Sequence, residues 1–480
     1  MQVNKSVFNF PRKLIENNLF FFGLLFVLFV WHFFTLSISP LPWFDEVFFA
    51  QMSLNLKQGL GLKLNWFLNP AMNQKEVLLY GPVYFWIQAA VIKWAGFSIF
   101  FFRLLNFLSG IGIVYLGFSI SKNYSAGKLN SRIFCLLLSL DTIFLQNMHS
   151  GRMDLFGILL FLAGLRMLLA ERRSAVSILL QAFCFSAAYL VTPRIGVYIV
   201  GLWPLAYNLF IHKGKYLLHY SILLLLTVVP ILAWIFFKFG SLQAYFQMFK
   251  SIEGDVRYLG FNLFPRKFEI PSLLVLVFFI GAGIVKKKFS LIKLVFLSLI
   301  FMHLLCIKEV GPYSAMFMPF LYLLIVGLYK ELSGLIYKMA IVSLLVYNLS
   351  IFTFKSVVLM ADYSNRTSGK LQNIISGMVP KGKTVLADFR FFYFLKNCHY
   401  LNWEQNRECL LAKSCLLDHV DYILFSPDDY SFAGKQGYLK NFKQVESYST
   451  APNGVYRYLE KAGVTISSNY NFVLLKKSGP

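Results

Sequence analysis

The sequence predicts an α-helical polytopic membrane protein of about 11 transmembrane helices, followed by a C-terminal α/β extracytoplasmic domain. Hydrophobic residues make up 57% of the 480 residues and charged residues only 14%, whereas about a quarter of the residues in a soluble domain are charged. Apolar runs of roughly 20 residues, long enough to cross the hydrocarbon core as helices, recur from Leu19 to about Met360. Beyond Met360 polar residues return. We therefore expect a membrane domain over residues 1–360 and a soluble domain over residues 361–480.

The first apolar stretch could be mistaken for a signal peptide, because Lys5, Arg12 and Lys13 precede it. It is longer than the usual signal core of about 7–15 residues, and no small-x-small cleavage site follows it. We therefore expect a retained first helix. The predicted membrane helices lie near residues 17–38, 100–120, 133–149, 155–170, 175–191, 195–211, 216–237, 270–285, 290–307, 313–329 and 339–360.

The net charge of +24 fits either a nucleic-acid-binding protein or the excess of Lys and Arg in cytoplasmic loops that orients membrane proteins. If the N-terminus is cytoplasmic, the short inner loops collect many of the basic residues. We therefore interpret the charge as a topology signal and expect no nucleic-acid partner. The protein is then a multi-pass protein of the cell (plasma or inner) membrane, with its C-terminal domain outside. The inner-loop residues are Lys122, Lys128, Arg132, Arg172, Arg173, Lys213, Lys215, Lys286, Lys287, Lys288, Lys330 and Lys338.

Two long loops accompany the C-terminal domain on the predicted outer side, at residues 39–99 and 238–269. Segment 83–97 in the first loop is apolar but short, and Lys93 interrupts it. We expect an interfacial or re-entrant helix there rather than a span. Counting it as a span would place Lys286–Lys288 outside, against the charge bias.

The C-terminal domain has the pattern of a mixed α/β fold. Strand-like runs occur at Lys383–Asp388, Val420–Ser426 and Val455–Leu459, with helical stretches and Gly/Pro turns between them. In an oxidising compartment two of its three cysteines could form a disulfide. Because three is an odd number, at least one thiol then stays free or pairs with another chain. These cysteines are Cys398, Cys409 and Cys415.

The first candidate site residues are the adjacent carboxylates Asp45 and Glu46, just beyond the first predicted helix. Neighbouring side chains point in different directions on a helix, so these two would not act as a matched pair on one proton. One could serve as general base while the other orients a substrate hydroxyl. The alternative is an acidic first turn that the helix dipole stabilises.

The turn His149–Asp154, on the same predicted side, is the second candidate. Arg152 and Asp154 share this turn of a few residues, although a tight outer turn needs polar residues in any case. Asp141 falls inside a predicted membrane helix, where a carboxylate is costly and marks a functional site by default. A hydrogen-bonded structural Asp facing the bundle fits that position equally well.

Basic residues on the predicted outer side are the third element, because their charge runs against the orientation bias. Arg194, Arg266 and Lys308 are such residues, and Arg and Lys suit phosphate groups. The alternative is contact with lipid headgroups or with nearby carboxylates. The sequence has no Gly-rich phosphate loop, no HExxH and no paired CxxC. It therefore supports neither a nucleotide-binding domain nor a structural zinc site.

Three ordered segments carry a family resemblance. WFDEVFFAQMSLNLKQG, LLYGPVYFWIQAAVIKWAGFSIFFFRLLNFLSGIG and GRMDLFGILLFLAGL resemble the type C membrane glycosyltransferases. Within that superfamily the chain looks most similar to the branch of protein O-mannosyltransferases and the lipid A aminoarabinose transferase. VTPRIG resembles the Thr-Lys-Gly turn of that branch, and GPYSAMFMPFLYLL resembles its Pro-Tyr…Pro segment. The similarity runs over most of residues 17–330.

The resemblance implies transfer of a sugar from a polyprenyl-phosphate carrier to an acceptor on the extracytoplasmic face. Asp45 matches the family's first-loop acidic residue, implicated as base or acceptor-orienting group, and Glu46 matches its neighbour. Asp154 matches the acidic residue of an Arg-x-Asp-like turn, and Arg194 matches a Lys thought to meet the donor phosphate. The expected catalytic residues are Asp45, Glu46 and Asp154; the expected donor phosphate contacts are Arg152, Arg194, Arg266, Lys308 and Tyr313.

The chain departs from the family pattern at Tyr80-Gly81-Pro82, where the aminoarabinose transferase carries an acidic residue and a Lys before the Pro. A metal site there is therefore in doubt; the sequence requires no cofactor and leaves a divalent metal open. Displacement by one base would invert the anomeric carbon. We expect a hexosyl- or pentosyltransferase that uses a lipid, glycan or protein acceptor and contacts membrane lipids.

Two other functions stay open on the sequence. A polytopic transporter or lipid flippase with a large outer domain is the main alternative. It would be favoured by charged residues at mid-membrane and by internal repeats, and only Asp141 fits that description. The third hypothesis is a catalytically inactive scaffold.

Overall fold

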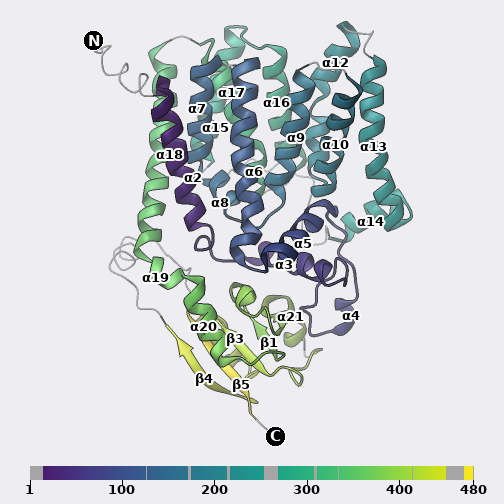
Figure 1. Cartoon of the computed structure of the whole chain (residues 1–480), viewed down its shortest axis with the longest axis vertical. Helices are drawn as coiled ribbons and strands as arrows, with labels where there is room; N and C mark the ends of the chain where they lie inside the picture. Colours follow the sequence, from purple (N-terminus) through teal and green to yellow (C-terminus); the bar gives the residue numbers. More distant parts are fainter. Residues whose placement is uncertain are drawn as a thin grey trace.

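Two parts make up the chain, a bundle of apolar helices and a small sheet domain at one end of it (Figure 1). This is the α-helical membrane architecture with a C-terminal α/β domain that the sequence predicts. The computed structural model describes residues 15–125, 127–170, 174–212, 217–252, 269–307, 311–332, 334–412, 414–449 and 470–478.

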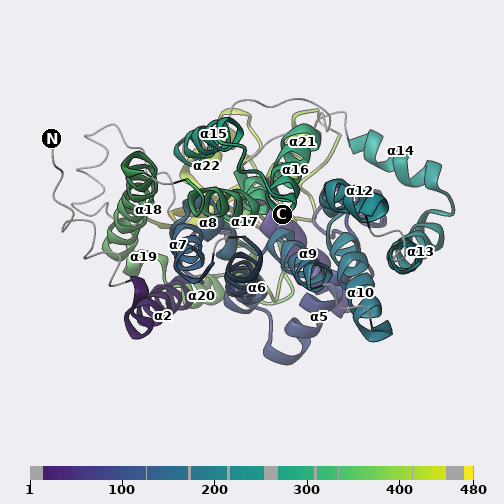
Figure 2. The same ribbon diagram turned by 90° about the horizontal axis from the view of Figure 1, so that it is seen from above.

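The bundle helices coincide with the apolar runs of the sequence, since each predicted membrane segment contains one helix or two consecutive ones. They lie side by side with their axes roughly aligned (Figures 1 and 2). Their bounds are α2 (Asn18–Thr35), α6 (Ile99–Ile120), α7 (Gly127–Leu140), α8 (Thr142–Met148), α9 (Asp154–Leu169), α10 (Ala175–Val191), α11 (Ile195–Val200), α12 (Trp203–His212), α13 (Leu217–Phe239), α15 (Ile270–Val285), α16 (Leu291–Cys306), α17 (Gly311–Tyr329) and α18 (Leu335–Ala361).

Length and composition support a multi-pass membrane protein. Among the described residues, 4 helical segments are long and apolar enough to cross a membrane, or up to 5 if the bent pair α7 and α8 is one span. The remaining bundle helices are shorter, so the number of complete crossings stays a prediction. The four segments are Asn18–Thr35, Ile99–Tyr124, Leu218–Phe239 and Leu335–Ala361.

Asp141 explains why one predicted membrane helix is broken. Helices α7 and α8 meet at 66°, and Asp141 caps the N-terminus of α8 by accepting hydrogen bonds from the backbone N–H groups of Ile143 (3.0 Å) and Phe144 (2.8 Å). Its second oxygen accepts a hydrogen bond from the Tyr322 hydroxyl at 2.7 Å. A short polar side chain favours such a cap over a helix interior. Asp141 thus has the hydrogen-bond partners that a structural residue facing the bundle is expected to have.

The basic loops gather at one end of the bundle. The connections between α6 and α7, α15 and α16, and α17 and α18 lie at the end away from the sheet domain (Figure 1). Lys122, Lys286–Lys288 and Lys330 belong to them. If this end faces the cytoplasm, as the excess of positive charge predicts, the sheet domain lies outside.

A reporter that is active only outside the cytoplasm, fused after Pro480, is expected to give full activity, because charge bias holds the opposite end of the bundle inside. The matched control carries the same reporter after Lys288 and should be inactive. Alkaline phosphatase activity in intact cells provides the measurement. Activity of the Lys288 fusion together with silence of the Pro480 fusion would reverse the orientation.

Three short helices of the first long loop lie at the sheet-domain end of the bundle, two of them between the bundle and the sheet domain and the third beside the sheet domain (Figure 1). They are α3 (Phe44–Lys57), α4 (Pro70–Asn73) and α5 (Val83–Ala95). Helix α5 packs against α3 and is not among the helices that are apolar and long enough to cross a membrane, in agreement with an interfacial position. A further helix, α14 (Leu242–Ile252), follows α13.

The sheet domain has five described strands in the order β2-β1-β3-β5-β4. Strand β1 pairs in parallel with β2 and β3, whereas β5 runs antiparallel to β3 and β4. Two predicted strand runs become β1 and β3; the third, Val455–Leu459, lies outside the described residues. The bounds are α19 (Tyr363–Arg366), α20 (Ser368–Met378), β1 (Thr384–Ala387), η3 (Phe389–Phe394), β2 (His399–Asn402), α21 (Trp403–Leu411), β3 (Tyr422–Phe425), α22 (Pro427–Lys435), β4 (Phe442–Tyr448) and β5 (Phe472–Lys477).

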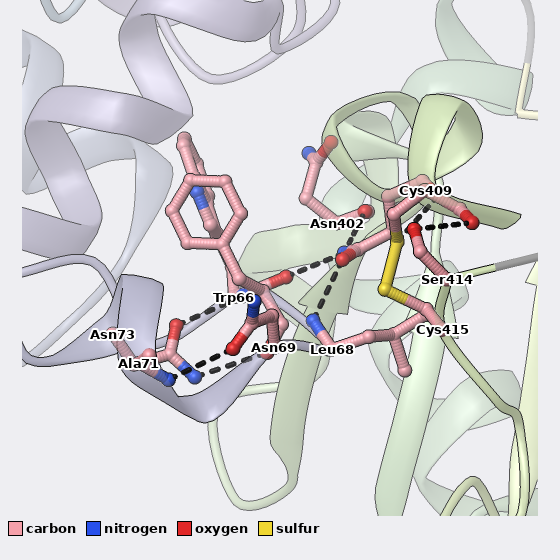
Figure 3. Close-up of a disulfide and its surroundings, with 11 residues drawn as sticks. Trp66, Leu68, Asn69, Ala71, Asn73, Asn402, Cys409, Ser414 and Cys415 are labelled. Atoms are coloured by element: carbon pink, nitrogen blue, oxygen red, sulfur yellow. Dashed lines mark hydrogen bonds between the residues drawn. A yellow bond between two sulfur atoms is a disulfide. The ribbon is translucent and has the colours of Figure 1, made fainter. Parts of the chain in front are cut away.

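A disulfide joins Cys409 and Cys415 at the end of α21 (Figure 3), so two of the three cysteines in this domain pair as predicted. Cys398 carries a free thiol. Disulfides persist in oxidising compartments, which is consistent with the predicted outer position of the domain.

The first loop is fastened to the sheet domain close to this disulfide (Figure 3). The carbonyl of Trp66 accepts hydrogen bonds from the backbone N–H of Asn402 (3.0 Å) and from the side-chain amide of Asn406 (2.7 Å). The Asn406 side chain in turn accepts one from the backbone N–H of Leu68 (2.6 Å). One apolar core also runs through both parts and includes Trp66, Tyr84, Val385 and Leu424. The loop and the sheet domain therefore form one packed unit.

Candidate active site

The first turn of α3 carries Asp45 and Glu46. Helix α3 begins after Trp43, and acidic residues in its first turn interact favourably with the helix dipole. Consecutive residues point in directions about 100° apart on a helix, and the two carboxylates indeed have different surroundings. The Asp45 side chain is 32% exposed, whereas that of Glu46 is fully buried.

Glu46 is held by Arg103 of α6. The Nε and Nη2 atoms of Arg103 donate to the two carboxylate oxygens at 2.6 and 2.7 Å, and its Nη1 donates to the carbonyl of Leu36 at 2.9 Å. Both side chains of the ion pair are fully buried. Such a bidentate pair is geometrically specific, so it fixes the first turn of α3 against the bundle.

Asp45 points in a different direction and pairs with Arg152, whose Nη1 donates to Asp45 Oδ2. Arg152 also donates from Nε to Asp154 Oδ2 at 2.6 Å. Its guanidinium carbon lies 5.3 Å from the ring centre of Trp43 and 4.6 Å from that of Tyr313. The buried Arg152 thus lies between a half-exposed carboxylate and a buried one.

The turn that carries Arg152 is built for close packing. The side-chain amide of Asn106 donates to the carbonyls of Ser150 (2.7 Å) and Arg152, and the Tyr84 hydroxyl donates to the carbonyl of Gly151 (2.7 Å). A Cβ atom at Gly151 would lie 2.2 Å from the ring of Phe102. Only glycine therefore fits here.

Arg194 approaches the same place from the turn after α10. Its Nη2 donates to the Tyr313 hydroxyl at 2.8 Å, and its guanidinium carbon lies 3.9 Å from the centre of that ring. The ring of Tyr80 lies 5.6 Å away. Burial and the neighbouring Tyr313 raise the pKa of the Tyr80 phenol, so the phenol stays neutral beside the Arg194 guanidinium. Gly81, next to Tyr80, packs directly against the backbone of α10, since a Cβ at Gly81 would lie 2.0 Å from the Leu190 carbonyl oxygen.

Most of the residues predicted from sequence for the site therefore meet in one place. Asp45, Arg152 and Asp154 form one chain of ion pairs, and Tyr313 contacts both Arg152 and Arg194. Glu46 is separated from them by its pairing with Arg103, and the Asp154 side chain is only 1% exposed. Lys308 and Arg266, also predicted phosphate contacts, lie outside the described residues.

No metal site is evident in the described part of the chain. Among these residues no group of three or more His, Cys, Asp and Glu side chains could hold a metal ion. Tyr80, in the segment where the sequence leaves a metal site in doubt, packs against Arg194.

Comparison with known proteins shows a likeness in structure only. No family profile and no curated protein sequence matches the chain. ArnT from Cupriavidus metallidurans bound to undecaprenyl phosphate superposes with a TM-score of 0.61 at 13% identity, covering 97% of this chain and 100% of that one. Its apo state gives 0.58 at 12% identity, covering 96% and 98%. The archaeal oligosaccharyltransferase AglB from Archaeoglobus fulgidus, in complex with an inhibitory peptide and a dolichol-phosphate, gives 0.50 at 11%, covering 89% and 73%.

The chain has the ArnT fold. The resemblance to the type C membrane glycosyltransferases that the sequence segments suggest is thereby confirmed at the level of the fold. The likeness to ArnT extends over nearly the whole chain, the C-terminal domain included.

Three residues of this site were not predicted. Arg103, Trp43 and Tyr80 contact Glu46, Arg152 and Arg194. Arg103 left a signal, because it is a charged residue inside an apolar helical run, and charge within a membrane helix indicates a partner. Trp43 and Tyr80 could not be recognised from the sequence, since aromatic residues occur throughout it.

Proposed function

We propose that the protein is an inverting glycosyltransferase that moves a sugar from a polyprenyl-phosphate carrier to a lipid, glycan or protein acceptor on the extracytoplasmic face. The observation that carries the proposal is the half-exposed Asp45 carboxylate, held by Arg152 beside Tyr313 and Arg194. The fold adds support, because ArnT has been seen with undecaprenyl phosphate and AglB with a dolichol-phosphate.

Asp45 is the proposed general base. It accepts the proton of an acceptor hydroxyl while the hydroxyl oxygen bonds to the anomeric carbon and the bond from that carbon to the carrier phosphate breaks. Attack by one nucleophile from the face opposite the leaving group inverts the configuration. The exposure of the Asp45 side chain supports this role, because a base must be within hydrogen-bond reach of the hydroxyl.

Arg194 and Tyr313 are the proposed contacts for the departing phosphate. Negative charge develops on the leaving group, and fixed cations and hydroxyl donors at that position lower the barrier. Arg194 is half-buried and oriented by the Tyr313 hydroxyl, which supports a preorganised contact. The positive charge of the buried Arg152, on the Tyr313 ring, is proposed to stabilise the departing phosphate as well. Lys308 and Arg266 remain proposed as further contacts.

Glu46 and Asp154 are proposed as positioning residues rather than as groups that touch substrate. Both side chains are buried, and each is paired with an arginine, Arg103 or Arg152. Glu46 orients the turn that presents Asp45. Asp154 orients Arg152, in the way that a second carboxylate holds a catalytic cation in one geometry.

Replacing Arg194 by Gln is expected to weaken binding of a polyprenyl phosphate by about 10- to 100-fold, since a hydrogen bond to a charged group is worth about 1.5–3 kcal/mol. Titration of the carrier into detergent-purified protein, followed by native mass spectrometry, provides the measurement. Transfer from a polyprenyl-phosphate sugar in vesicles should fall in parallel.

The matched control is Arg166→Gln. Arg166 is also partly buried and hydrogen-bonded, to Ser119 and Tyr124, but it lies near the C-terminal end of α9, one helix length from the Asp154 turn. Carrier affinity should be unchanged in this variant. Equal affinity for the carrier in wild type and Arg194→Gln would remove Arg194 from the phosphate site.

A further inference from the structure

A cavity of about 730 Å³ lies between the sheet domain and the bundle. Helices α2, α8 and α18 form one side of it, and the segments that follow strands β1, β2 and β3 form the other. Asp45, Arg194 and Tyr313 do not line it. The cavity is therefore a second feature, beside the site described above.

The cavity lies at the carboxyl ends of parallel strands, where ligands of such sheets commonly bind. Asp388 follows β1 and Ser426 follows β3, and both line the cavity. These two strands are parallel neighbours, but the chain leaves β1 towards β2 and leaves β3 towards the other edge of the sheet. Ligands of parallel sheets bind outside the carboxyl ends of the strands at such a point of divergence. Cavities between domains are also common ligand sites.

Carboxyl groups dominate the polar lining on the sheet-domain side. Asp388 accepts two hydrogen bonds from the side chain of Arg390, at 3.0 and 2.7 Å. Glu404 and Asp429 line the cavity beside them. Burial, together with Asp388 and Asp429, raises the pKa of Glu404 to about 7, although Arg390 and Arg407 oppose the shift. Burial also raises the pKa of Asp429. Three basic side chains, those of Lys355, Arg366 and Arg390, also line the cavity, against the four carboxyl groups of Asp388, Glu404, Asp428 and Asp429. Because the carboxyl groups outnumber the basic side chains, an anionic ligand is disfavoured.

The opposite wall supplies aromatic rings. Trp31 of α2 and Phe352 and Phe354 of α18 line the cavity, and Phe389 does so from the sheet domain. A sugar ring has apolar faces and a rim of hydroxyl groups. Its faces pack on aromatic rings, and its hydroxyls donate to carboxylates, which only accept when ionised. The lining thus matches an uncharged sugar better than a phosphate or a peptide carboxylate.

Trp43 is shared by the cavity and the proposed catalytic residues. Trp43 lines the cavity, and its ring centre lies 5.3 Å from the guanidinium carbon of Arg152, which pairs with Asp45. His149, in the same turn as Arg152, also lines it. Trp43 therefore belongs both to the cavity lining and to the surroundings of the Asp45–Arg152 pair.

We propose that this cavity binds uncharged, hydroxyl-rich sugar units of the acceptor, so that the acceptor is a glycan or carries one. The assignment of the sugar to the acceptor rests on the function proposed above. The binding of a sugar in the cavity is independent of that function. The carboxyl groups of Glu404 and Asp429 accept hydrogen bonds from the sugar hydroxyls, and the α18 rings cover one sugar face.

The test is an array of defined oligosaccharides, neutral, sulfated and sialylated, probed with the detergent-purified full chain without any donor lipid. The wild type is expected to retain neutral oligosaccharides only. For the strongest of them, Glu404→Gln should weaken binding measured by calorimetry at pH 8.5, above the pKa of Glu404 of about 7, by about 10-fold, because a charge-assisted hydrogen bond is lost. The control is Glu408→Gln, one turn further along α21 and outside the cavity lining, which should bind as the wild type does.

Phe354→Ala should also weaken binding, whereas Phe236→Ala, which removes a comparably exposed ring from α13, should not. Retention of no oligosaccharide, retention of anionic ones only, or equal loss in the Glu404 and Glu408 variants would overturn the proposal. Sugar binding without any transfer from a polyprenyl-phosphate sugar would instead overturn the proposed function and leave the binding site standing.

Discussion

Replacing Asp45 by Asn is expected to lower sugar transfer by about 10²- to 10⁴-fold, the usual contribution of a positioned general base. An amide has nearly the same shape but cannot take up the proton of the attacking hydroxyl. Arg152 keeps its second partner, Asp154, in this variant, so the fold and the phosphate contacts should persist. The measurement is formation of the glycosylated product in vesicles from a defined polyprenyl-phosphate sugar, alongside carrier binding, which should stay near the wild-type value.

Glu76→Gln is the matched control, because it makes the same chemical change in the same loop. Glu76 pairs with Lys238 at 3.1 Å, with both side chains partly exposed, and an exposed pair contributes only about 0–1 kcal/mol. Activity should therefore be nearly unchanged. If Asp45→Asn transferred sugar at the wild-type rate, the base would have to be sought elsewhere.

The bundle could be predicted from sequence because its signal is local. Apolar runs and basic loops are read within about 20 residues, and the helices fall where these runs lie. The break between α7 and α8 was not predicted, since residues 133–149 form one continuous apolar pattern. It follows from Asp141, whose side chain bonds the backbone N–H groups of the next turn instead of continuing the helix.

The site was predictable in part. Asp45, Arg152, Asp154 and Arg194 stood out as charged residues in loops of one predicted side, and topology was enough to place them together. The pairings that orient them were not predictable, even though Tyr313 itself was an expected phosphate contact, because the paired residues lie far apart in the chain. Arg103 lies 57 residues from Glu46, and Tyr313 lies 119 residues from Arg194. No periodicity within one segment encodes such a pair.

Removing one member of the Glu46–Arg103 pair is expected to destabilise the protein by about 3–5 kcal/mol, because each single change leaves a buried charge without its partner. Both side chains have no exposed surface. In Glu46→Leu the guanidinium keeps only the Leu36 carbonyl as acceptor. In Arg103→Met the carboxylate loses both of its donors. The thermal unfolding midpoint of the detergent-purified protein should fall sharply in either variant.

The double variant Glu46→Leu/Arg103→Met separates two explanations of that loss. If the pair serves mainly to avoid an unpaired charge, apolar residues of similar size should restore most of the stability, as replacement of buried ion pairs often does. If the pair also aims the first turn of α3, transfer activity should stay low in the double variant although the midpoint recovers, because Asp45 is then no longer held towards Arg152. A double variant as unstable as the two losses combined would show that the residues do not act as a pair. Recovery of both stability and activity would leave Glu46 a packing residue, and the orientation of Asp45 would then rest on Arg152 alone.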